Sequence, residues 1–84
     1  MRKKDSPNRR IHERVNPLGS GVTFYGDRAI LEEVRRIYRA TCGVKHTSAV
    51  SRSGGTFYLL CCCKDTAEVD RLRRAIAEQN ITTC

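Results

Sequence analysis

Five cysteines and two histidines are the side chains of this sequence that could bind a metal ion or form disulfides. Three of the cysteines are consecutive, at positions 61–63, and consecutive residues of a strand point to alternate faces, so they cannot converge on one ion. The sequence has no C-x-x-C pair, and neither histidine has a partner at the spacing of a zinc site. We therefore expect no metal, cofactor or disulfide, and interpret the cysteines as small buried hydrophobic residues.

Catalytic side chains show no recognisable pattern either. No Ser-His-Asp, Cys-His or paired-carboxylate arrangement can be argued from the spacing of these residue types. The prediction is a protein that binds a partner and is not an enzyme.

Basic residues give the strongest indication of what that partner is. The 84 residues contain 16 Lys and Arg against 9 Asp and Glu, a net charge of +7, which favours a negatively charged partner and nucleic acid, RNA or DNA, first. Base stacking would need aromatic side chains, for which Tyr25 and Tyr58 are candidates. The candidate phosphate-binding residues are Arg2, Lys3, Lys4, Arg9, Arg10, Arg14, Lys45 and Arg52.

The cellular compartment is predicted from the lack of a membrane-spanning run and of a signal-peptide pattern in the sequence. No apolar run approaches the roughly 20 residues of a membrane span, and the basic start is followed by polar residues, unlike a signal peptide. We expect a cytoplasmic protein that does not contact membranes, in which the thiols stay reduced.

Hydrophobic periodicity divides the chain into an arm and one domain. Residues 1–19 contain Pro7, Pro17 and Gly19 and show no apolar period, which predicts a basic flexible N-terminal arm. Residues 20–84 predict a strand at 20–25, a helix at about 28–41, a strand at 44–51, a central strand between Gly54-Gly55 and Lys64, a helix from Asp65 to about Gln79, and a short strand at 81–83.

This order predicts an α+β fold of the ferredoxin-like βαββαβ type. Right-handed crossovers would give a four-stranded antiparallel sheet in the order 4-1-3-2, with both helices on one face. Side-chain alternation puts Phe57, Leu59 and Cys61 on one face of the central strand, and we expect this face to meet the helices, whereas the reverse assignment would expose Phe57. Tyr58, Leu60 and Cys62 would lie on the other face with Tyr25 of the first strand.

An uncovered apolar sheet face leaves two classes of function open. The RNA-recognition motif stacks bases on such a face, but only Gly55 and Tyr58 fit its third-strand pattern, and the chain is not assigned to that family. The alternative is a protein-interaction adaptor or inhibitor, of the size that phages and mobile elements encode, which binds a host protein complex. In either case we expect a homodimer whose interface contains Tyr25, Tyr58, Leu60 and Cys62.

Overall fold

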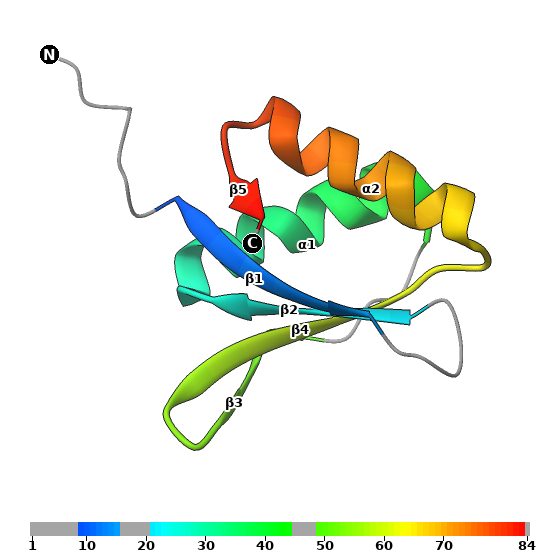
Figure 1. The fold of residues 1–84 in the computed structure, drawn as a ribbon. Coiled ribbons are helices and arrows are strands. Elements are labelled where there is room, and N and C mark those ends of the chain that lie inside the picture. Colours follow the sequence, from blue (N-terminus) through cyan, green and yellow to red (C-terminus); the bar gives the residue numbers. More distant parts are fainter. Residues whose placement is uncertain (1–8, 16–20, 45–48, 84) are drawn as a thin grey trace, which may run out of the picture.

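Two helices cover one face of a mixed five-stranded sheet in this protein (Figure 1). The computed structural model describes residues 9–15, 21–44 and 49–83. Its elements in chain order are β1 (Arg10–Val15), β2 (Gly21–Gly26), α1 (Arg28–Cys42), β3 (Ser51–Ser53), β4 (Thr56–Cys62), α2 (Thr66–Glu78) and β5 (Thr82–Thr83). The predicted α+β class and the placement of both helices on one face are confirmed.

The strand order differs from the predicted ferredoxin-like sheet. The observed order is β3-β4-β2-β1-β5, so β1 lies between the two strands that were expected to be neighbours, β5 and β2. β1 pairs antiparallel with β2 and parallel with β5, which makes the sheet mixed and not purely antiparallel. The expected pairing of β2 with β4 at the centre of the sheet is correct.

Strand β1 comes from the segment that was expected to be a flexible arm. Its residue Ile11 is fully buried and pairs with Gly26 of β2, where a Cβ would approach Ile11 Cγ2 to 3.0 Å. Thr82 N–H donates to the carbonyl of Arg9 at 2.9 Å and brings β5 onto the far edge of β1. The expected arm residues 1–8 and 16–19 lie outside the described residues.

The hairpin of β3 and β4 is shorter than the sequence suggested. Gly54 and Gly55 form the turn with φ of 58° and 84°, a left-handed conformation that favours glycine in a two-residue hairpin loop. Strand β3 has three residues, and Ala49 and Val50 of the expected strand 44–51 are not in strand conformation. Residues 45–48 of that expected strand are not described.

Both helices end as the sequence predicts, but only one has a side-chain cap. Gly43 follows α1 with φ of 64°, and Asn80 follows α2 with φ of 62°. At the start of α2, Glu68 N–H donates to Asp65 Oδ1 at 2.9 Å, and Lys64 N–H donates to Glu68 Oε1 at 2.9 Å. Asp27 precedes α1 in an extended conformation and makes no side-chain capping bond.

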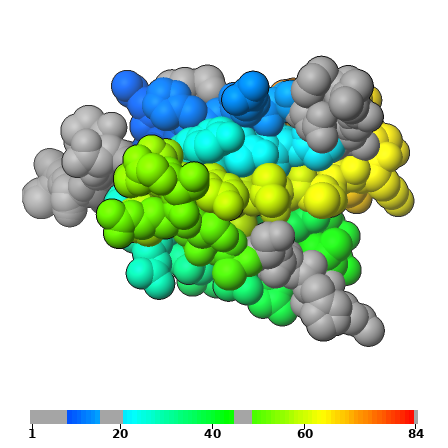
Figure 2. Space-filling model, turned by 90° about the horizontal axis from the view of Figure 1, so that it is seen from below, coloured from blue at the N-terminus to red at the C-terminus, as the bar shows by residue number. Residues whose placement is uncertain are grey.

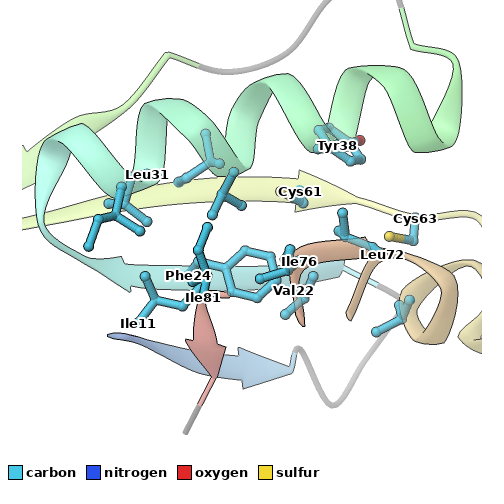
Figure 3. Close-up of a cluster of buried hydrophobic side chains, with 14 residues drawn as sticks. Ile11, Val22, Phe24, Leu31, Tyr38, Cys61, Cys63, Leu72, Ile76 and Ile81 are labelled. Carbon is cyan, nitrogen blue, oxygen red and sulfur yellow. The ribbon is translucent and has the colours of Figure 1, made fainter. Parts of the chain in front are cut away.

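The core lies between the sheet and the helices (Figure 3). Phe24 and Leu59 are fully buried at its centre, whereas Phe57 is only partly buried at its margin. The alternation along β4 is as predicted, because Leu59 is 0% exposed and its neighbour Leu60 is 46% exposed. Within the described residues, neither helix has the length and apolar character needed to cross a membrane.

Candidate functional site

The sheet face opposite the helices, here called the open face, combines aromatic and basic side chains. Alternation along the strands places these residues on it: Arg10, His12 and Arg14 of β1, Thr23 and Tyr25 of β2, Ser51 and Ser53 of β3, and Tyr58, Leu60 and Cys62 of β4. Figure 2 views the molecule from this side, with β1, β2 and β4 as adjacent blue, cyan and yellow bands. The predicted grouping of Tyr25, Tyr58, Leu60 and Cys62 on one face is therefore present.

A row of paired residues crosses four strands at the middle of the open face. His12 pairs with Tyr25, Tyr25 with Tyr58, and Tyr58 with Ser51. The two tyrosine rings have centroids 6.3 Å apart and planes inclined at 42°. Such a pair offers a tilted aromatic surface on two paired strands, with the imidazole of His12 opposite Tyr25 on the next strand.

A second row lies two residues along the strands from the first. It joins Arg14 to Thr23 and Thr23 to Leu60. Strands rise about 3.3 Å per residue, so the two rows are roughly 6.6 Å apart. His12 therefore ends the first row and Arg14 ends the second, and the apolar Leu60 lies two residues from Tyr58 on the same face of β4.

The basic residues of 9–14, which were expected to lie together on a flexible arm, fall into two groups in the structure. Arg9 donates from Nη1 and Nη2 to the carboxylate of Glu33 at 3.2 and 3.0 Å, and from Nη2 to the carbonyl of Gln79 at 2.8 Å. It therefore ties the start of β1 to both helices. Arg10 and Arg14 are exposed on the open face, and neither forms an ion pair with any other described residue.

The remaining candidate phosphate-binding residues lie away from the open face or are not among the residues that the structure describes. Arg52 pairs with Phe57 on the helix side of the sheet, with its guanidinium carbon 5.9 Å from the Phe57 ring centroid. Arg2, Lys3, Lys4 and Lys45 are not among the described residues. His12 was not selected from the sequence, because its place beside Tyr25 depends on β1.

A second cluster, on the helix side, brings together residues that are far apart in the sequence. Cys42 ends α1, Cys63 follows β4, and Glu68 lies in the first turn of α2; their sulfur and carboxylate oxygen atoms all lie within 4.8 Å of one another. Burial raises the pKa of Cys63 to about 11, with Cys42 and Glu68 contributing, and burial also raises the pKa of Cys42. Both thiols are therefore protonated at neutral pH.

Of the other described cysteines, Cys61 is buried as expected and Cys62 is exposed. Cys61 is 1% exposed in the core, and burial raises its pKa to about 12. Cys62 is exposed on the open face, and Cys84 is not described. Buried Tyr38 donates its hydroxyl to the Cys62 carbonyl at 2.6 Å and accepts from the Cys62 N–H at 3.1 Å, which ties α1 to β4.

Comparison with known proteins gives no relative. No protein-family description matches the chain, and neither the curated proteins nor the solved structures contain a significant match.

Proposed function

We propose that the chain is a non-enzymatic module that binds single-stranded nucleic acid on its open face. The observation that carries the proposal is the row His12–Tyr25–Tyr58, with Arg10 and Arg14 on the same strand as His12. Unpaired bases stack on aromatic side chains while cations contact the phosphates, and this combination does not require a particular base sequence.

The distribution of charge supports the same proposal. Salt bridges on the helix side engage Arg9 with Glu33 and Arg73 with Glu13, so these two cations are partly neutralised. Arg10 and Arg14 have no carboxylate partner among the described residues and remain available to phosphates. With a net charge of +7, long-range attraction would concentrate a polyanion near the protein.

Fluorescence anisotropy with labelled single-stranded RNA and DNA of equal length tests the proposal. Tyr58→Ala should weaken binding by about 1–3 kcal/mol, the value of one stacked base, whereas Tyr58→Phe keeps the ring and should bind nearly as the wild type. Equal binding by Tyr58→Ala and the wild type would contradict a stacking role. Comparing the two labelled strands shows whether RNA or DNA is preferred.

The second candidate is a protein contact, and exposed Leu60 is the observation that favours it. At 46% exposure beside Thr23, Leu60 offers an apolar point for a second copy of the chain or for a host protein. A twofold pairing of open faces would cover Leu60 together with Tyr25, Tyr58 and Cys62. Light scattering decides whether the chain is dimeric, and Leu60→Glu should convert any dimer of this kind to a folded monomer.

A further inference from the structure

A buried carboxylate beside two thiols is the feature that the proposed function leaves unexplained. Glu68 is 9% exposed, and among the described residues its carboxylate accepts one hydrogen bond, from Lys64 N–H, and forms no ion pair. Buried carboxylates are costly unless they are paired or bind a cation. Cys42 and Cys63 are the neighbouring groups that could share such a cation.

We propose that Cys42, Cys63 and Glu68 form a binding site for a zinc ion. Two thiolates and one carboxylate are a ligand set that selects zinc over the hard cations calcium and magnesium, which prefer oxygen ligands. Three protein ligands leave a fourth tetrahedral position, which water can reach because Cys42 is only half-buried.

The distances require a small adjustment. Zinc bonds of about 2.3 Å to sulfur and about 2.0–2.2 Å to oxygen place two sulfurs and one oxygen of a tetrahedral site roughly 3.5–3.8 Å apart. The two sulfur atoms and one Glu68 carboxylate oxygen lie within 4.8 Å of one another, so a contraction of about 1 Å completes the site. Cys42 and Cys63 come from different elements, yet their sulfur atoms lie within this distance of each other, so both side chains point into the same space.

Charge balance is favourable at this position. Binding one Zn²⁺ releases one proton from each thiol, so two thiolates and the Glu68 carboxylate give the site a net charge of −1. Glu68 lies in the first turn of α2, where the helix dipole stabilises negative charge.

A bound zinc would join three elements that pack at one end of the core. Cys42 is the last residue of α1, Cys63 directly follows β4, and Glu68 belongs to α2. In Figure 3, Cys63 lies toward one end of the buried cluster, beyond Cys61, and Leu72 of α2 belongs to the same cluster. The ion would thus fix the start of α2 against the end of α1 and stabilise the fold.

Titration of reduced, chelator-treated protein with Zn²⁺ and with Co²⁺ tests the site. One equivalent of Co²⁺ should give thiolate charge-transfer and tetrahedral d–d absorption, and one equivalent of Zn²⁺ should displace it and raise the melting temperature. Cys62→Ser is the matched control, because Cys62 is adjacent in sequence but exposed on the opposite face. It should bind metal as the wild type does.

The ligand variants should separate metal binding from folding. Cys42→Ser and Cys63→Ser should lose the cobalt spectrum and weaken zinc binding by more than about 100-fold. This exceeds the roughly 10- to 100-fold loss that follows removal of a residue that only hydrogen-bonds to a metal ligand. Glu68→Gln keeps an oxygen for the Lys64 N–H and should weaken zinc binding at least about 10-fold, with the helical circular dichroism retained. Absence of one-to-one binding, or binding that Cys42→Ser leaves intact, would overturn the proposal.

Discussion

Arg73 of α2 and Glu13 of β1 form the contact that anchors the first strand to the helical layer. Arg73 Nε donates to both carboxylate oxygens of Glu13 at 3.0 Å, and the Glu13 side chain is only 12% exposed. Glu13 thus occupies a helix-facing position, between Ile11 and Val15 on the same side of β1. An ion pair takes the place of an apolar contact there.

Breaking this pair should destabilise the fold measurably. We expect Glu13→Gln to lower the free energy of unfolding by about 1–2 kcal/mol, since a charged hydrogen-bond partner is lost at a partly buried site. Asp70→Asn is the control, because Asp70 also pairs with Arg73 but is 64% exposed, and its loss should cost less than about 0.5 kcal/mol. Urea denaturation measures both, and equal costs would contradict the anchoring role of Glu13.

Two neighbouring leucines of β4 should differ sharply in their contribution to stability. Leu59→Ala should cost about 2–5 kcal/mol because Leu59 is fully buried, whereas Leu60→Ala should change stability by less than about 0.5 kcal/mol. Among the aromatics, Phe24→Ala should cost about 3–5 kcal/mol and partly buried Phe57→Ala less. A larger loss for Leu60→Ala than for Leu59→Ala would mean that the faces of β4 are reversed.

Salt dependence should distinguish phosphate contacts on β1 from those of the residues before it. Each contact to a single strand contributes about 0.7 to the slope of log affinity against log salt, so Arg14→Ala should reduce the slope by about 0.7. Arg36→Ala, at an exposed position of α1, should leave it unchanged. Deleting residues 1–8, which contain Arg2, Lys3 and Lys4, should reduce the slope by about 2 if all three contact phosphates.

Alkaline pH should expose the contribution of Tyr38. Burial raises its pKa from 10.0 to about 12, so between those values the unfolded chain loses the phenolic proton while the folded chain keeps it. The stability that Tyr38 provides is complete below pH 10 and is lost as the pH rises toward 12. Tyr38→Phe should be less stable at pH 8, and its difference from the wild type should shrink above pH 10. If the difference in unfolding free energy between Tyr38→Phe and the wild type stayed constant from pH 8 to 12, the raised pKa of Tyr38 would be contradicted.

Much of the fold follows from local patterns in the sequence. Residues 21–26 and 56–62 alternate between helix-facing and open-face side chains, and Gly43 and Asn80 end their helices. Tyr25 and Tyr58 were predicted to share a face for the same reason. Once two strands are neighbours, the alternation along each strand determines which of their side chains lie on the same face of the sheet. The strand alternation and the helix ends depend on residues close together in the chain, and the tyrosine pair needs in addition only the predicted pairing of β2 with β4.

The features that were missed depend on contacts between distant residues. In β1 the helix-facing positions are Ile11, Glu13 and Val15, so the expected apolar period is interrupted by an acidic residue whose partner is 60 positions away. The alternation was nevertheless visible in Arg10, His12 and Arg14 on the other face. Cys42 and Cys63 are likewise brought together by packing of α1 against β4, which spacing in the sequence does not reveal.

The parallel pairing of β1 with β5 has a consequence for the newly synthesised chain. Arg10 and Ile11 pair with Thr82 and Thr83, so this edge of β1 stays uncovered until more than 70 further residues have been translated. An unpaired strand edge is a template for association with other chains, and charged side chains along a strand disfavour such pairing. Arg10 and Arg14 would thus protect the nascent chain from aggregation before they serve any ligand of the folded protein.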